Sequence, residues 1–368
     1  MIQDDVAAML RSLLREVGET PSPTFSEGDR AELVAGWLSE AGFAPARDAV
    51  GNVVVSLPGG EGPLVALVAH LDSVFPIEVD VRVRELSEAH WTAPGLGDNA
   101  ASVAVLVGLA RRIANGGLVR RPRLLLAFTV GEEGTGDLRG ARHFVARHAA
   151  QLDVFIAVDG YLGSVVDAGV GSRRHRVAFA AEGGHAWGDY PSPSAVHALG
   201  DAVHAVTRTP LPELVASSLN VAEVGGGSAI NAIAASAWFT VDLRSVAEDV
   251  LERIEQEVLR RVRSVARRHR VQLEVTPLGA RPAGRSDDGS LWRLVRTALE
   301  AHGIEARRGV SSTDANAAMQ VGIPAVCLGV YRGGHAHRLD EWVDARSLPH
   351  GLAVLEAVLT ALATEGRT

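Results

Sequence analysis

The sequence contains the run Arg123-Leu124-Leu125-Leu126-Ala127-Phe128-Thr129-Val130-Gly131-Glu132-Glu133-Gly134. An apolar run that passes directly into glycine is typical of a buried strand ending in a loop. Neighbouring side chains on an extended backbone point to opposite sides. Glu132 and Glu133 can therefore do different work, one binding a metal ion while the other stays available as a base.

Further apolar runs lie on both sides of this stretch and alternate with helical patterns. We expect strands at residues 52–57, 64–69, 123–130, 154–158 and 325–330. We expect two helices within residues 1–46, one after Asp98, one after Gly140, one at 291–301 and a last one from Ser347. This alternation predicts an α/β fold with a mainly parallel sheet and helices on both faces.

The pattern changes from about Arg174 onward. Strand patterns at 177–181, 218–224, 237–243 and 271–275 are interleaved with helical patterns at 194–206 and 250–266. The order βαββαβ predicts a small α+β unit with a four-stranded sheet and two helices. We therefore expect an α/β domain over residues 1–173 and 280–368, interrupted by an inserted domain over residues 174–279.

Composition excludes several classes of partner. The net charge of −8 argues against nucleic acid or an anionic membrane as the main partner. The single cysteine, Cys327, cannot form an internal disulfide and sits in an apolar stretch, so we expect a buried hydrophobe. No signal peptide pattern opens the chain, and no run approaches the ~18 apolar residues of a membrane span. We expect a soluble cytoplasmic protein.

Histidine and carboxylate residues follow several of the apolar runs. His70-Leu71-Asp72 ends the run at 65–69, and because residues i and i+2 share a face, the Asp72 carboxylate can approach the His70 ring from behind. That arrangement orients a metal-binding histidine. Taken alone, the motif more often represents a strand-end histidine beside a solvated aspartate.

Three more candidates complete the pattern. Asp98 follows Gly95-Leu96-Gly97 and precedes a small-residue helix, where it either caps the helix or bridges two cations. Asp159 ends another apolar run, and His337 lies in a glycine-bearing loop. Strand ends of one polarity converge on one crevice of an open α/β sheet, so we expect these residues to meet. Histidine nitrogens with carboxylate oxygens suit zinc, cobalt or manganese.

These motifs together resemble the co-catalytic zinc peptidase family that includes carboxypeptidase G, peptidase T, acetylornithine deacetylase and aminoacylase. The matching stretches occur in the order of the family, at residues 69–74, 97–100, 131–134, 158–160 and 337–342. The resemblance covers essentially the whole chain, with the inserted segment as the family's lid. The sequence around Glu132 is nearest to peptidase-T-like members.

The resemblance implies a site for two Zn²⁺ ions, with Co²⁺ or Mn²⁺ as possible substitutes. Asp98 would bridge the two ions, and its peptide bond to Asn99 would be cis. One ion would be held by His70 and Asp159, the other by Glu133 and His337. Asp72 would orient His70. Glu132, free of metal, would be the general base that takes a proton from the metal-bridging water.

The lid carries three further candidates. His185, in Gly183-Gly184-His185-Ala186, would reach the site of the partner subunit and support the oxyanion, so the resemblance implies a homodimer formed through the lid. Asn231 and Arg244 match positions that hold the polar or carboxylate end of the substrate. His185 also has a simpler reading as a turn residue, and Arg244 as a strand-end surface residue. Trp187 replaces a small residue of the family pattern, and no proline follows Asn231.

The expected function is metal-dependent hydrolysis of an amide bond in a small peptide or acylated amino acid. An aminopeptidase or di/tripeptidase is our first hypothesis. A carboxypeptidase or N-acyl-amino-acid deacylase is the alternative, because family members with the same ligands divide among these activities. An inactive dimeric binding protein is the third possibility, but Glu132 and all five ligand positions are retained.

Overall fold

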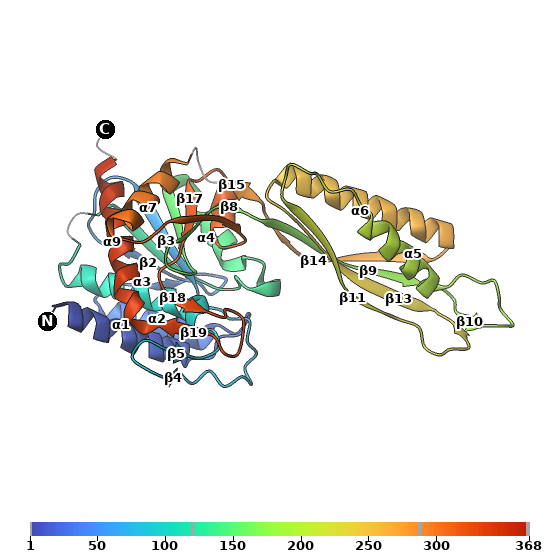
Figure 1. Ribbon diagram of the computed structural model, residues 1–368, viewed down its shortest axis with the longest axis horizontal. Coiled ribbons are helices and arrows are strands. Elements are labelled where there is room, and N and C mark those ends of the chain that lie inside the picture. The colour runs from blue at the N-terminus through green and yellow to red at the C-terminus, as the bar shows by residue number, and fades with distance from the viewer. Residues whose placement is uncertain (1, 119–120, 286–288, 366–368) are drawn as a thin grey trace. The chain divides into compact units, whose positions relative to one another are not determined.

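The computed structural model describes residues 2–118, 121–285 and 289–365. The chain divides into two compact units (Figure 1). The first comprises residues up to Gly169 and from Arg285 onward, and the second comprises Val170–Gly284. The second unit begins before residue 174 and ends after residue 279 because its first and last strands pair with each other from Ser172↔Arg281 onward.

A nine-stranded sheet forms the centre of the first unit. Its order is β1-β2-β6-β3-β7-β17-β8-β15, and β16 pairs with β8. The pairs β3–β6, β3–β7, β7–β17 and β8–β16 are parallel, whereas β1–β2, β2–β6 and β8–β17 are antiparallel. The mainly parallel sheet expected from the sequence is confirmed. The strands are β1 (Ala46–Arg47), β2 (Val53–Leu57), β3 (Leu64–His70), β6 (Arg123–Thr129), β7 (Val154–Val158), β8 (Ser164–Gly169), β15 (Gly284–Arg285), β16 (Arg307–Ser311) and β17 (Ala325–Leu328).

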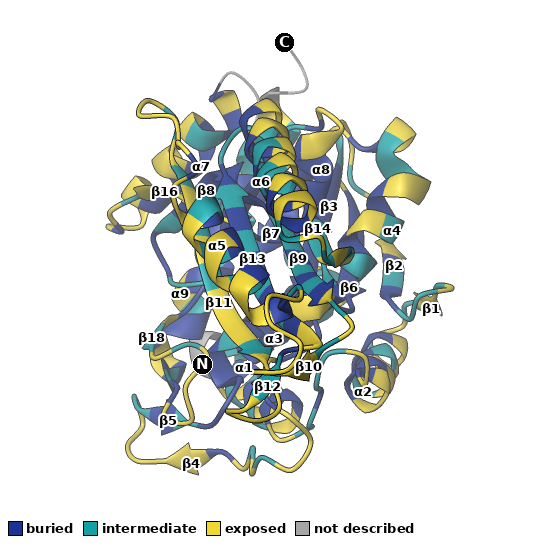
Figure 2. Ribbon diagram, turned by 90° about the vertical axis from the view of Figure 1, so that its right-hand side faces the viewer, coloured by how far each residue is buried: buried dark blue, intermediate teal, exposed yellow. Residues whose placement is uncertain are grey.

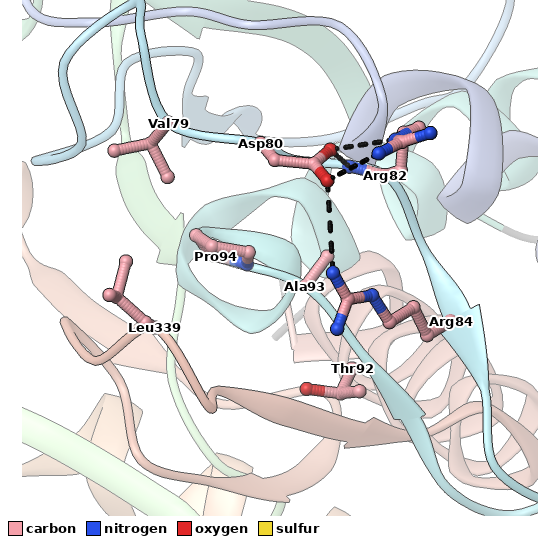
Figure 3. Close-up of a pocket in the computed structure, with 8 residues that line it drawn as sticks. All are labelled: Val79, Asp80, Arg82, Arg84, Thr92, Ala93, Pro94 and Leu339. Atoms are coloured by element: carbon pink, nitrogen blue, oxygen red, sulfur yellow. Dashed lines mark hydrogen bonds and ion pairs between the residues drawn. The ribbon is translucent and has the colours of Figure 1, made fainter.

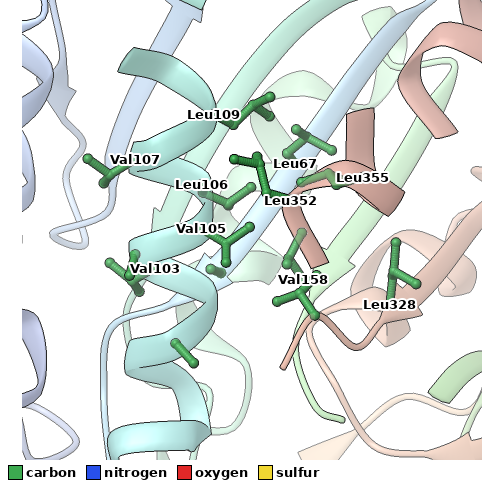
Figure 4. Close-up of a cluster of buried hydrophobic side chains, with 14 of the residues drawn as sticks. Leu67, Val103, Val105, Leu106, Val107, Leu109, Val158, Leu328, Leu352 and Leu355 are labelled. Atoms are coloured by element: carbon green, nitrogen blue, oxygen red, sulfur yellow. The ribbon is translucent and has the colours of Figure 1, made fainter. Parts of the chain in front are cut away.

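Helices cover both faces of this sheet. Val65 and Leu67 of β3 pack in one apolar cluster, whereas Ala66 and Val68 pack in another, because side chains alternate along a strand. The first cluster takes in α1 (Ile2–Gly18), α2 (Gly28–Glu40), α3 (Ser102–Ala114), α7 (Ser290–Ala301) and α9 (Leu348–Glu365). The second takes in α4 (Arg139–His148) and α8 (Ala315–Gln320). Figure 4 shows the leucines of α3 and α9 gathered beside Leu67.

The helical segment formed by η4 (Ala345–Ser347) and α9 has the length and apolar composition of a membrane span over residues 345–364. Half of that window is buried in the fold. Leu352 and Leu355 are at most 2 % exposed and belong to the same core cluster as Leu106 of α3. Core packing therefore accounts for the hydropathy of α9.

A second, small sheet of the first unit orders two loops. It runs β18-β19-β5-β4, with β4 (Arg84–Glu85), β5 (Trp91–Thr92), β18 (Arg332–Gly334) and β19 (Trp342–Asp344). Trp342 pairs with Thr92, so chain segments about 250 residues apart lie side by side. The loop between β18 and β19 is thereby fixed next to the segment that follows β5.

The second unit is the expected βαββαβ arrangement. Strands β9 (Gly171–Ala180), β11 (Ser217–Gly226), β13 (Ser236–Ser245) and β14 (Gln272–Arg281) form an antiparallel sheet in the order β11-β13-β9-β14. Helices α5 (Ala195–Thr207) and α6 (Glu248–His269) pack on one face of it. The apolar residues of α6 are buried, and its outer face is exposed (Figure 2). Strands β10 (Gly184–His185) and β12 (Ala232–Ile233) form a separate pair.

Candidate metal centre

His70 is the last residue of β3 and is almost completely buried. Its Nδ1 lies 3.0 Å from the main-chain oxygen of Asp72. A carbonyl can only accept, so Nδ1 carries the proton and Nε2 presents a lone pair. The sequence assigned this orienting role to the Asp72 carboxylate, but its nearer oxygen, Oδ1, is 3.5 Å from Nδ1. The main chain of Asp72 therefore makes the shorter contact with the His70 ring.

Asp98 lies in a π-helical turn, η1 (Leu96–Ala101), that precedes α3. The turn is kinked at Asp98, whose φ and ψ are −105° and 94°, and the Asp98–Asn99 peptide bond is cis, as the resemblance implied. The buried Asn99 side chain donates from Nδ2 to the carbonyl of Val158 at 3.0 Å. Asp159 follows Val158 at the end of β7, so Asn99 ties the loops of two candidate ligands together.

The Glu132–Glu133 pair lies in the loop after β6, entered through Gly131 at φ 64°. Both main-chain amides of the pair donate to the buried Asp72 carboxylate, Glu132 N to Oδ1 and Glu133 N to Oδ2, each at 2.9 Å. The Asp72 carboxylate therefore holds the loop of both glutamates. This role was not expected from the sequence.

His337 lies between β18 and β19 with a left-handed φ of 66°. Its Nε2 is 3.0 Å from Oδ2 of Asp98 and 3.1 Å from Oε1 of Glu133. On the other side of Asp98, Oδ1 lies 3.1 Å from Nε2 of His70. Asp98 thus faces one histidine with each carboxylate oxygen.

The candidate ligands form two groups that share one residue. His70, Asp98 and Asp159 make the first group, and Asp98, Glu133 and His337 make the second. Within each group the potential ligand atoms lie within 4.8 Å of one another. His70, Glu132 and Glu133 make a third such group, which places the Glu132 carboxylate beside the same cluster.

This donor set fits divalent cations. His70 Nε2 and Asp98 Oδ1 are buried, and among the residues that the structure describes they find no hydrogen-bond partner. Buried polar atoms are costly unless they are satisfied, so a cation between them would supply what they lack. Two imidazoles with three carboxylates are the ligand types of zinc, cobalt and manganese sites.

The electrostatics of the cluster also favour a cation. Burial, and then the charge of Asp98, raise the pKa of Asp159 to about 7. The hydrogen bonds to Asp98 and Glu133 raise the pKa of His337 to about 11. Burial opposes ionisation of Asp98, but the adjacent His337 and His70 side chains hold its pKa well below the usual range. The crowded carboxylates are thus balanced by protons that a metal ion would displace.

The segment before α2 and the first turn of α2 support this site. The Thr24 hydroxyl donates to Oδ2 of Asp72 at 2.9 Å, and Oε1 of Glu27 accepts the Gly131 amide at 2.9 Å. The buried Arg30 donates from Nη1 to the carbonyl of Leu71 at 2.8 Å, and burial lowers its pKa to about 10. The sequence analysis missed all three. The signal in the sequence was an arginine, Arg30, among the apolar residues of one helix face.

Glu341 was also missed, although it lies in the matching stretch at 337–342. Its carboxylate is 1 % exposed and accepts the amides of Gly95, Gly97 and Asp98. Burial and the charge of Asp98 raise the pKa of Glu341 to about 8, and the hydrogen bonds from the three main-chain amides oppose that shift. An acid directly before the apolar pair Trp342-Val343 was the signal in the sequence.

A cavity of about 370 Å³ lies beside the two ligand loops (Figure 3). Pro94 leads into the Asp98 turn, and Leu339 is two residues beyond His337. Asp80, which also lines the cavity, is paired with Arg82 at 2.8 Å and with Arg84 at 3.7 Å. The cavity lining thus combines apolar residues of the ligand loops with an ion-paired group.

The three remaining candidates lie in the second unit. His185 and Asn231 are brought together, because β10 pairs with β12 and the Ala186 amide donates to the carbonyl of Asn231 at 2.9 Å. The amides of Trp187 and Gly188 both donate to Nδ1 of His185, at 3.2 Å each. The neutral ring therefore carries its proton on Nε2.

Arg244 lies elsewhere in the second unit. It pairs with Ser172 across the sheet, at the end of β13 remote from the β10–β12 pair. Its guanidinium binds Asp242 at 2.9 Å. The structure therefore places Arg244 at the end of β13 that lies away from His185 and Asn231.

Comparison with known proteins finds relatives by sequence and by structure. The cytosol non-specific dipeptidase of Escherichia coli K12 is 27% identical over 293 residues, which cover 68% of this chain and 57% of the dipeptidase. The chain thus matches just over half the length of that relative. Aminopeptidase PepT from Bacillus cereus has a TM-score of 0.82 at 20% identity, covering 97% of this chain and 99% of that one. A tripeptidase from Staphylococcus aureus has a TM-score of 0.83 at 19% identity, with the same coverage of both chains.

The family assignment rests on most of the chain. Residues 66–361 match the peptidase family M20/M25/M40, a range that contains all five candidate ligands and both glutamates of the pair. The comparison structures share the fold from end to end, including the inserted unit. This chain belongs to peptidase family M20/M25/M40.

Proposed function

We propose that this protein is a metal-dependent exopeptidase that hydrolyses an amide bond in small peptides. The main support is that two groups of candidate ligands share Asp98, with the Glu132 carboxylate beside them. The similarity to a dipeptidase, an aminopeptidase and a tripeptidase supports peptides as substrates. It also favours an aminopeptidase or di/tripeptidase over a carboxypeptidase or N-acyl-amino-acid deacylase.

His70, Asp98 and Asp159 would hold one divalent cation, and Asp98, Glu133 and His337 a second, with zinc as our first choice. Two cations bound there would lower the pKa of a bound water and polarise the scissile carbonyl. Glu132, the other residue of the pair, would not bind a metal ion. Its carboxylate takes a proton from the attacking water and passes it to the leaving amine.

The second unit completes the proposal as a lid that forms a homodimer. The Nε2–H of His185 is a donor suited to an oxyanion, since Nδ1 is already occupied by two amides. Trp187, Tyr190 and Ile230 are large, strongly exposed side chains around the His185–Asn231 pair. Exposed apolar groups of this kind support a partner subunit at this end of the unit.

Residues other than the metal ligands would bind the ends and the side chains of the substrate. Asn231 and Arg244 are our candidates for holding the polar or carboxylate end. The apolar wall of the cavity beside Leu339 suits a small apolar side chain. The similarity to a cytosol dipeptidase supports action in the cytoplasm.

Three matched peptides test the proposal. The protein, supplied with zinc, cobalt or manganese, is incubated with a free tripeptide, its N-acetylated form and its C-terminal amide. We expect cleavage of the free and amidated peptides and loss of cleavage on acetylation. Loss on amidation instead supports a carboxypeptidase, and cleavage of the acetyl group itself supports a deacylase. Metal uptake without hydrolysis of any peptide would leave the inactive binding protein as the better account.

A further inference from the structure

We infer that Glu341 is a positioning residue for Asp98, the ligand shared by both candidate metal sites. The inference rests on the proposed metal centre and adds to it a residue that touches neither metal nor substrate. Oε1 of Glu341 accepts the Gly97 amide at 2.9 Å and the Asp98 amide at 2.8 Å, and Oε2 accepts the Gly95 amide at 2.8 Å. One side chain thus holds the Asp98 turn at three points.

Glu341 is itself held by its main chain. Its carbonyl accepts the Thr92 hydroxyl at 2.7 Å and the Ala93 amide at 3.2 Å, at the end of β5. Glu341 directly precedes β19, whose residue Trp342 pairs with Thr92 in the small sheet. The carboxylate is therefore presented from a fixed backbone.

The position of Glu341 in the chain adds a second connection. It lies four residues after His337, in the same loop between β18 and β19. Its carboxylate therefore joins the loop of His337 to the turn of Asp98, and these two residues share the second ligand group. The three hydrogen bonds from main-chain amides to Glu341 thus hold two candidate ligands of one cation next to each other.

A carboxylate is required for this contact. Both oxygens of a carboxyl group can accept, whereas the NH₂ group of a glutamine can only donate. In Glu341→Gln, the amide nitrogen would face a donor, and at least one of the three buried N–H groups would lose its partner. The Asp98 turn would then shift, or it would be destabilised by a main-chain N–H without a partner.

Gly97 offers an independent way to disturb the same contact. A Cβ atom at Gly97 would lie 2.7 Å from Oε1 of Glu341 and 2.5 Å from the Tyr331 hydroxyl. Its φ lies outside the left-handed region, so alanine suits the backbone there. Gly97→Ala would therefore displace the Glu341 carboxylate, together with the Tyr331 side chain, while Glu341 itself is unchanged.

Zinc titration of metal-free protein, in competition with a chelator, tests the inference. Because Asp98 belongs to both groups, Glu341→Gln should weaken both binding events together, by about 10- to 100-fold. Gly97→Ala should act in the same direction. The matched control is Asp340→Asn, the adjacent but exposed carboxylate that pairs with Arg338 and His335. We expect its two affinities to stay within about twofold of wild type.

Circular dichroism of each metal-free variant confirms that the titrated protein is folded. If Glu341→Gln does not fold, Gly97→Ala alone decides. Wild-type affinity at both sites in a folded variant overturns the inference, as does weakening of one site alone. These outcomes are separate from failure of the metal centre, in which wild type itself binds no zinc and both claims fall.

Discussion

Oδ1 of Asp72 accepts the main-chain N–H of Glu132 at 2.9 Å. The other oxygen, Oδ2, accepts the amide of Glu133 at the same distance. The main chain of Asp72 meanwhile fixes the ring of His70. One residue therefore aligns a candidate metal ligand with the loop that carries both the candidate base and another ligand.

Asp72→Asn tests this coupling. An asparagine presents an NH₂ group to one of the two loop amides, so the Glu132–Glu133 loop should lose one anchor. We expect kcat to fall and zinc affinity to weaken, each by about 10- to 100-fold. Peptide hydrolysis and zinc titration measure the two effects. Glu40→Gln, an exposed carboxylate paired with Arg111, serves as the control and should leave both unchanged.

A mixing experiment tests the position of His185 in the homodimer. We combine Glu132→Gln protein with His185→Ala protein, each of them nearly inactive alone. If His185 serves the site of the partner, a mixed dimer has one complete site, and about a quarter of wild-type activity returns at equal mixing. If His185 serves its own subunit, no mixed dimer contains a complete site. Absence of recovery after confirmed subunit exchange would therefore contradict the proposal.

Metal uptake should release protons and strengthen with rising pH. In the metal-free protein, the pKa of His337 is raised to about 11 and that of Asp159 to about 7. At pH 7 His337 is protonated and Asp159 partly so, and both must lose protons to bind metal. Zinc affinity should thus rise by about tenfold per pH unit for each proton displaced. Calorimetry in buffers of different ionisation enthalpy counts the protons, and a pH-independent affinity would contradict the assignment.

Much of the fold could be predicted because its signals are local. The run from Leu124 to Val130 and the run before His70 are apolar, uninterrupted and bounded by turns, so strands and their ends could be located. Candidate ligands followed from those strand ends. In the second unit, the regular spacing of buried residues along α6 gave the helix, and the order of elements gave the sheet.

The remaining features depend on contacts that a local pattern does not contain. The strands β4, β5, β18 and β19 are two or three residues long, too short to show a period. The Asp72 carboxylate meets amides 60 and 61 residues further along the chain. Glu341 meets the Asp98 turn across 243 residues. Such supporting residues could be recognised as acids, but their partners are set by the tertiary fold.

The central claim is that Glu132 and Glu133 do different work, and paired glutamine variants test it most directly. Each variant is assayed for zinc content and for hydrolysis of the free tripeptide, beside wild type. We predict that Glu132→Gln keeps both zinc ions and loses about 10²- to 10⁴-fold in kcat. Glu133→Gln should instead bind zinc more weakly, with activity partly restored by excess metal. Loss of zinc from Glu132→Gln, or full activity in it, would contradict the account.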